Sequence, residues 1–228
     1  MGSNLIDHPW ISVDVPAPPD PPPAPLAQVA FTFRSTAANA VDPAGAPDLH
    51  LVPCSAMRVP ETESPTGSLF LVGVSVLKPR SRGRVWLRSP DPMDAPRIAP
   101  AHLRDPLDMA RALEGVVAAR TLLRTAPLSE LVAGAELRPA PGVADDDAAG
   151  LAAGIRATFG TYHHPVGTCR MGPDPDGGAV VDSRGRVHGI EGLWVADASV
   201  MPDIPSANTN LPTIMVAEQI AGWLREDL

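Results

Sequence analysis

Two side chains in the last third of the chain could together remove a proton from an alcohol. His164 stands before a proline in the segment Thr161–Gly172, so its backbone is expected to be extended or turned. Histidine suits this chemistry because its unperturbed pKa of about 6.5 lets it exchange a proton near neutral pH. Asn208 could hold the substrate hydroxyl, since an amide donates and accepts hydrogen bonds without titrating. Each residue alone also has a plainer explanation, as a histidine held by a backbone hydrogen bond and an asparagine in a loop.

The last two elements of the chain could approach a ligand. A predicted buried strand, Leu193–Val195, leads into Asp197 and Ala198, and small residues let a ligand come close to the backbone. Pro212 is predicted to begin the final helix, with Asn210 as its N-cap. The amide groups at a helix N-terminus favour negative charge, so this end could stabilise an anionic group. An ordinary strand-to-loop connection is the alternative.

The composition indicates a globular protein and argues against several function classes. Hydrophobic residues make up 44% of the 228 residues, and the net charge of −8 disfavours a nucleic-acid partner. Two cysteines, Cys54 and Cys169, are too few for a disulfide framework or a zinc site, so no metal is expected. No apolar run reaches about 18 residues, so no membrane span is expected. The N-terminus lacks the features of a secretory leader, and the cytoplasm is the expected location.

Local patterns predict a sheet followed by helices. Apolar and alternating runs predict strands of one antiparallel or mixed sheet at 29–34, 49–52, 69–77 and 83–88. Helices are predicted at 105–124, 127–133 and 145–159, and from residue 212 onward. The connections are expected to be a polyproline spacer at 16–25 and two long loops at 35–47 and 53–67, which are either lids over a pocket or disordered segments.

Three segments, taken in order, resemble the C-terminal signature of the glucose–methanol–choline (GMC) family of flavin oxidoreductases. They read His-Pro-Val-Gly-Thr-Cys-Arg-Met-Gly at 164–172, Gly-Leu-Trp-Val-Ala-Asp-Ala-Ser-Val-Met-Pro at 192–202, and Asn-Thr-Asn-Leu-Pro-Thr-Ile-Met-Val-Ala-Glu at 208–218. Residues 4–8, Asn-Leu-Ile-Asp-His, resemble the family's Asn-Leu-x-Asp-His element. Because the segments 79–85 and 105–108 also resemble the entry to the family's substrate domain, the resemblance spans essentially the whole chain.

The resemblance implies FAD-dependent oxidation of a CH–OH group, in which a base takes the alcohol proton while hydride passes to the flavin. The base would be His164, its hydrogen-bonding partner Asn208, and His163 would line the substrate pocket. The positions expected along the flavin are Asp197 and Ala198 at its ribityl–phosphate part, and Asn210 and Pro212 near the isoalloxazine ring. The implied substrate is a small-molecule alcohol, and neither its identity nor the electron acceptor follows from these motifs.

The implied fold class is α/β: an α+β substrate domain with a mostly antiparallel sheet, plus the C-terminal piece of a Rossmann-like FAD domain. Residues 1–9 would be a remnant of the FAD domain, residues 10–175 the substrate-binding domain, and residues 176–228 the C-terminal part of the FAD domain. Members of the family are considerably longer and begin with a Gly-x-Gly-x-x-Gly turn that holds the FAD pyrophosphate. No such segment occurs in this sequence.

Three explanations of this difference stay open. The chain is a fragment or a mis-called start of a full enzyme, or it is one subunit of a split enzyme whose separate partner chain supplies the ADP-binding half. The third explanation, from another class, is a non-catalytic module that binds a protein. Without the ADP-binding half, residues 192–226 are expected to expose apolar surface that would otherwise pack on it.

Overall fold

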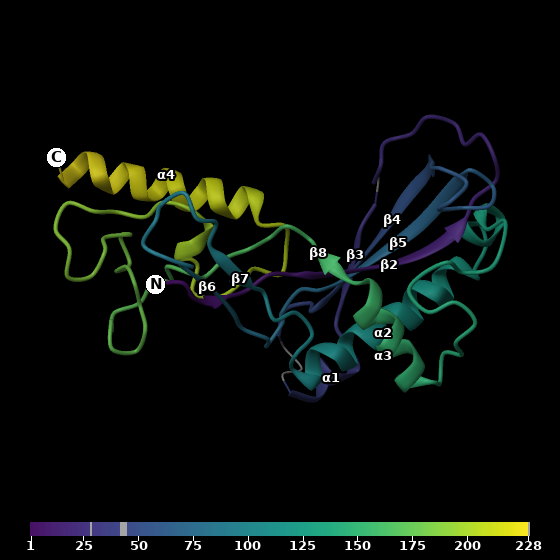
Figure 1. Cartoon of the computed structure of the whole chain (residues 1–228), viewed down its shortest axis with the longest axis horizontal. Coiled ribbons are helices and arrows are strands. Elements are labelled where there is room, and N and C mark those ends of the chain that lie inside the picture. The colour runs from purple at the N-terminus through teal and green to yellow at the C-terminus, as the bar shows by residue number, and fades with distance from the viewer. Residues whose placement is uncertain (28, 42–44, 228) are drawn as a thin grey trace. The chain divides into compact units, whose positions relative to one another are not determined.

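The computed structural model describes residues 1–27, 29–41 and 45–227, and the chain forms two compact units (Figure 1). The terminal unit comprises Met1–His8, Leu77–Asp105 and His163–Leu228, and the sheet unit comprises Pro9–Val76 and Pro106–Tyr162. The fold mixes helices with antiparallel sheet, as predicted. These units do not follow the expected domain limits at residues 9 and 175, and that functional division stays a prediction.

The sheet unit is built on a five-stranded antiparallel sheet with the order β3-β4-β5-β2-β8. Its strands are β2 (Pro9–Pro16), β3 (Phe31–Phe33), β4 (Leu49–Arg58), β5 (Ser68–Val76) and β8 (Gly160–Thr161). Side chains of a strand alternate between its two faces, and Ile11 and Val13 on β2 are fully buried. Strand β2 therefore contributes one face to the core of this unit.

Helix α2 (Pro106–Leu123) covers this sheet and contacts β5, β4 and β2 (Figure 1). Its approach is close: a Cβ added to Gly115 would lie 2.5 Å from Cγ1 of Val74 on β5. Helix α3 (Ala148–Thr158) begins after Asp147, whose side chain accepts a hydrogen bond from the Gly150 amide at 2.9 Å. Two short elements, α1 (Thr36–Val41) and the 3-10 helix η1 (Leu128–Leu131), complete the unit.

The terminal unit joins the first residues of the chain to the segment that carries His164. Its strands β1 (Ser3–Leu5), β6 (Gly83–Trp86) and β7 (Arg97–Ala99) form a sheet of order β1-β6-β7. Directly after β1, Ile6 and Val166 exchange two backbone hydrogen bonds of 3.0 and 2.8 Å. Their side chains form a buried cluster with Met201 and Ile204. The family-like element at residues 4–8 is thereby fixed against the chain that follows His164.

The C-terminal helix α4 (Asn210–Asp227) leaves much of its apolar surface exposed. Leu211 is 77% exposed, Ile214 53% and Met215 66%, whereas Ile220 is 2% exposed and packs with Val181 and Val200. The prediction that residues 192–226 expose apolar surface is thus confirmed. None of the helices in the described part of the chain is long and apolar enough to cross a membrane.

Several local predictions were wrong. The segment Leu193–Val195 is not a buried strand, because Leu193 is 47% exposed and pairing is limited to one bridge, between Arg186 and Trp194. Its apolar composition indicates surface that this chain does not cover. Asn210 is the first residue of α4 rather than its cap. The expected lid at 53–67 begins as strand, since β4 continues to Arg58, while the expected loop at 35–47 contains α1 and extends over residues 42–44, outside the described residues.

Gly167, three residues after His164, has a backbone that only glycine adopts without strain. Its φ is +89°, and an added Cβ would lie 2.5 Å from the carbonyl oxygen of Asn4. We expect Gly167→Ala to lower the free energy of unfolding by about 1–2 kcal/mol for the left-handed backbone and by about 1–3 kcal/mol more for the clash. Urea denaturation followed by circular dichroism measures this loss.

Gly189→Ala is the matched control, because Gly189 has a φ of +74° but open space around the added Cβ. It should show the backbone contribution alone. Equal losses in the two variants would mean that the close approach to Asn4 does not constrain the chain.

Candidate active site

His164 is held in a buried position at the end of a fixed backbone segment. His164 is only 7% exposed, although the neighbouring His163 and Pro165 are exposed. The backbone N–H of His164 donates to Oδ1 of Asp7 at 2.9 Å. A histidine that neighbours a proline and is anchored through its own amide has little backbone freedom.

The ring of His164 meets a second buried imidazole. Its Nδ1 lies 2.9 Å from Nδ1 of His8, which is fully buried. The two rings are nearly perpendicular, at 88°, with centroids 5.1 Å apart. The other nitrogen of His8, Nε2, lies 2.9 Å from the carbonyl oxygen of Leu77. His8 therefore connects the ring of His164 to the backbone at the start of the Leu77–Asp105 segment.

Asp7 fixes the backbone while His8 fixes the ring. The Asp7 carboxylate is itself buried, and its second oxygen, Oδ2, lies 3.0 Å from Nε2 of His102. Asp7 thus holds the backbone amide of His164, 157 positions later in the sequence. His8 holds the ring of His164 across 156 positions. Such double anchoring reduces the rotamer freedom that a reactive side chain would otherwise have.

Burial lowers the pKa of His8 from 6.5 to about 4, because the charged imidazolium loses its hydration. The nearby His164 ring lowers this pKa further, while the carbonyl groups of Leu77 and Pro205 act in the opposite direction. His8 is therefore neutral at pH 7. The contact with the Pro205 carbonyl also brings the segment that leads to Asn208 against the same imidazole that holds His164.

The other residues singled out by the sequence lie on the surface of the terminal unit. Asn208 and Asn210 are exposed, and Asn210 and Pro212 are the first and third residues of α4. His163 is exposed with a φ of +62°. Asp197 is exposed too, and its Oδ1 accepts the Ser199 amide at 2.8 Å. Ala198, half-buried, begins the 3-10 helix η2 (Ala198–Val200) that Asp197 caps.

The residues around α4 fit the polar edge of a flavin. Oγ of Ser206 is buried and has no hydrogen-bond partner within the described part of the chain, and an unpaired buried hydroxyl is unfavourable. The exposed amides of Asn208 and Asn210 and the positive N-terminus of an 18-residue helix lie within the next few residues. No group of three or more metal-ligating side chains occurs among the described residues.

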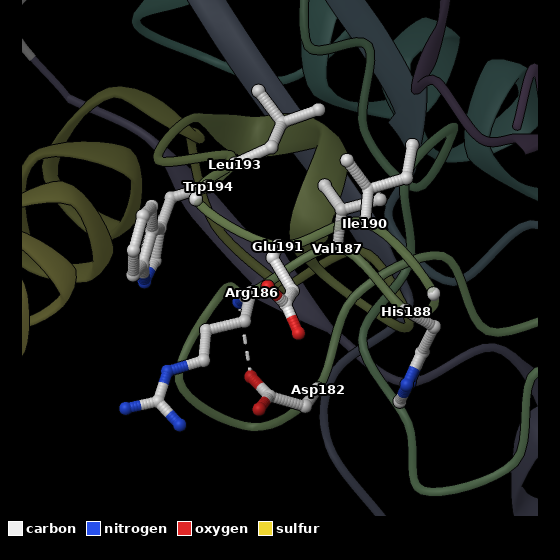
Figure 2. Close-up of a pocket in the computed structure, with 10 residues that line it drawn as sticks. Asp182, Arg186, Val187, His188, Ile190, Glu191, Leu193 and Trp194 are labelled. Atoms are coloured by element: carbon white, nitrogen blue, oxygen red, sulfur yellow. Dashed lines mark hydrogen bonds between the residues drawn. The ribbon is translucent and has the colours of Figure 1, made fainter.

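A shallow pocket in the same unit contains none of the predicted site residues. Figure 2 shows its lining, which comes from the segment between Asp182 and Trp194. Oδ1 of Asp182 accepts a hydrogen bond of 3.0 Å from the backbone N–H of Arg186 and so shapes the turn. Ile190 and Leu193 are 55% and 47% exposed there. The lining mixes these apolar side chains with the charged Asp182, Arg186 and Glu191.

Sequence reasoning missed Asp7 and His8 as parts of the site. The spacing of 156 residues between the two histidines carries no local signal, because hydrogen bonds across such a distance depend on tertiary structure. The available signal was the resemblance of residues 4–8 to the family's Asn-Leu-x-Asp-His element, which contains both Asp7 and His8.

Comparison with known proteins shows the family to which this chain belongs. The GMC oxidoreductase family model for the C-terminal domain matches residues 79–217, so the chain belongs to the GMC oxidoreductase family. It is 44% identical over 152 residues to an alcohol dehydrogenase [acceptor] of Pseudomonas putida, and 43% identical over 156 residues to an oxygen-dependent choline dehydrogenase of Burkholderia lata. These matches cover 67% and 68% of this chain but 27% of each relative.

Solved structures show the same fold. Pyridoxine 4-oxidase from Mesorbium loti superposes with a TM-score of 0.85 at 30% identity, over 99% of this chain and 44% of that one. A formate oxidase of Aspergillus oryzae, in a structure concerned with FAD modification, superposes with a TM-score of 0.85 at 24% identity, over 99% of this chain and 47% of that one. The chain thus spans less than half the length of these proteins.

The lowered pKa of His8 predicts an acid-sensitive fold. Between pH 6.5 and 4 the unfolded state binds a proton at this site that the folded state does not, so the free energy of unfolding falls as the pH falls through this range. The full loss is about 3 kcal/mol, from about 1.4 kcal/mol for each unit of pKa shift. Urea unfolding at a series of pH values measures it.

Replacement by glutamine separates this contribution from those of other groups. His8→Gln should reduce the loss in the free energy of unfolding between pH 6.5 and 4 by about 3 kcal/mol. His188→Gln, which alters an imidazole bonded to the Gly172 carbonyl, should leave this loss unchanged. A wild-type profile that matches His8→Gln between pH 6.5 and 4 would contradict a neutral buried His8.

Proposed function

We propose that this chain carries the proton-accepting and substrate-holding residues of an FAD-dependent oxidation of an alcohol CH–OH group. His164 is the general base and Asn208 holds the substrate oxygen. The observation that carries the proposal is the 2.9 Å contact between Nδ1 of His164 and Nδ1 of His8. It engages one nitrogen of the candidate base and directs proton uptake to the other, Nε2.

The residues of the chain would act in a defined order. The amide of Asn208 would hydrogen-bond the alcohol oxygen, and Nε2 of His164 would take the hydroxyl proton. Asp7 and His8 would keep the imidazole in place during the transfer. FAD, when bound, would supply the acceptor for the hydride that leaves the alcohol carbon.

The remaining predicted residues would hold the cofactor and shape the pocket. Asn210 and Pro212 open helix α4, whose N-terminus favours negative charge, and would lie by the isoalloxazine ring. Asp197 and Ala198 would lie along the ribityl–phosphate part, with the Asp197 carboxylate also capping η2. His163 would line the substrate side. An FAD cofactor is supported by the formate oxidase neighbour, whose structure concerns FAD modification.

The substrate class proposed is a small-molecule alcohol. Support comes from the names of the relatives, an alcohol dehydrogenase and a choline dehydrogenase, and of the structural neighbour pyridoxine 4-oxidase. The cytoplasmic location expected from the sequence stays a prediction.

We propose further that a flavin-binding half covers the exposed apolar side chains at the start of α4, Leu211, Ile214 and Met215, and those of Ile190 and Leu193. These side chains are between 47% and 77% exposed. Three of them, Leu211, Ile214 and Met215, lie three and four residues apart on α4 and so share one face of that helix, and an exposed apolar patch is typical of an interface. The relatives have the extra length to supply such a cover, since the matches span 27% of each. This half would belong either to the same polypeptide or to a separate chain.

The same exposed face favours one other function, a non-catalytic module that binds a protein. The two functions differ in what His164 does. In the alternative, an imidazole held by His8 is only structural, and alcohol would not reduce a flavin bound to the assembled protein.

His164→Ala tests the proposed role in the flavin-loaded protein, which is this chain assembled with its flavin-binding half and FAD. Loss of a general base should slow flavin reduction by alcohol by about 10²–10⁴-fold. Stopped-flow absorbance of the flavin under anaerobic conditions measures the rate. His188→Ala, a histidine bonded to a backbone carbonyl elsewhere in the same unit, should react at the wild-type rate. Near-normal reduction in His164→Ala would remove His164 from this role.

A further inference from the structure

The hydrogen position on His8 follows from its partner at Nε2. The carbonyl oxygen of Leu77, 2.9 Å away, accepts hydrogen bonds and has no hydrogen to donate. Nε2 of His8 must therefore carry the hydrogen. Because burial lowers the pKa of His8 to about 4, the ring is neutral at pH 7 and has only this one N–H. Its Nδ1 consequently holds a lone pair and accepts.

The hydrogen position on His164 follows in turn. Its Nδ1 lies 2.9 Å from the accepting Nδ1 of His8, in a region where both residues are buried. The opposite tautomer of His164 would place two lone pairs against each other at this distance and leave both nitrogens without a hydrogen bond between them. Unmade hydrogen bonds between buried groups are unfavourable. Nδ1 of His164 therefore donates.

We infer that His8 is a positioning residue that fixes His164 as the tautomer protonated at Nδ1, which leaves the basic lone pair on Nε2. The tautomer itself rests on the hydrogen bonds alone, and only its use in catalysis rests on the function proposed above. When an alcohol reacts, its O–H bond breaks and an Nε2–H bond forms on His164. The imidazolium that results still donates its Nδ1–H to His8, so the contact persists through the transfer.

In many proton-transferring sites a carboxylate accepts the hydrogen bond that orients the histidine ring. Here a neutral imidazole, that of His8, accepts it. A carboxylate partner would add a negative charge beside the base, whereas His8 supplies only a lone pair at a defined position. A nearby carboxylate, that of Asp7, accepts instead from the backbone N–H of His164 and lies against His102. Orientation of the ring and anchoring of the backbone are thus carried by two different side chains.

Long-range ¹H–¹⁵N correlation spectra of the ¹⁵N-labelled 228-residue chain test the inference without any cofactor. The spectra are recorded at mildly alkaline pH, where protonated and unprotonated ring nitrogens resonate in well-separated regions. His164→Gln assigns the resonances of His164. The wild-type protein should show Nδ1 of His164 as protonated and Nε2 as unprotonated, and His8 should show the reverse.

Two substitutions of His8 separate its two hydrogen bonds. In His8→Asn the amide oxygen can take the place of Nδ1 and accept from His164, so the tautomer of His164 should be kept. In His8→Gln the amide reaches the place of Nε2 and can still bond the Leu77 carbonyl, but the acceptor for His164 is lost. His164 should then shift toward the tautomer protonated at Nε2, the usual one for an exposed histidine, while the resonances of His188 stay unchanged.

A wild-type His164 protonated at Nε2 would overturn the inference, and so would an unchanged tautomer in His8→Gln. Either result would leave open whether His164 takes a proton from an alcohol. Conversely, a flavin-loaded protein that no alcohol reduces would remove the proposed function and leave the tautomer assignment standing.

Discussion

A hydrogen bond between two imidazoles imposes a strict condition, because one ring must donate and the other must accept. At the 2.9 Å contact between His8 and His164 the donor is settled by a backbone carbonyl on the far side of His8, that of Leu77. These two hydrogen bonds determine which ring nitrogen of His164 carries the hydrogen and which one can accept a proton. If His8 gained a proton, both of its nitrogens would be donors and the bond to a neutral His164 would have to reverse.

The surrounding structure maintains this condition by holding two distant segments together. The paired backbones of Ile6 and Val166, and the cluster that their side chains form with Met201 and Ile204, place residues 6–8 beside residues 164–166. Gly167 permits the chain to pass against the Asn4 carbonyl where no other residue would fit. The site is therefore held by contacts within the terminal unit, whereas Leu193 and the apolar side chains at the start of α4 are exposed.

The sequence predicted some parts of this arrangement and not others, for identifiable reasons. Helix α2 was predicted because Asp105 and Pro106 are local start signals and the apolar spacing of a helix is visible in one window. His164 stood out because its neighbours form a dense motif. The strand β2 was missed because it begins and ends at prolines, which usually argue against a central strand. His8 was missed because its role comes from a partner that only the folded chain brings near.

The most direct measurement is a double-mutant cycle between His8 and His164, read as the anaerobic rate of flavin reduction by alcohol in the flavin-loaded protein. If His8 acts only through His164, His8→Gln slows the wild type, but adding it to His164→Ala changes the rate by less than about twofold, because residues that share one interaction are not additive. Losses that multiply in the double variant would show that His8 acts independently of His164 and would contradict this assignment of the base.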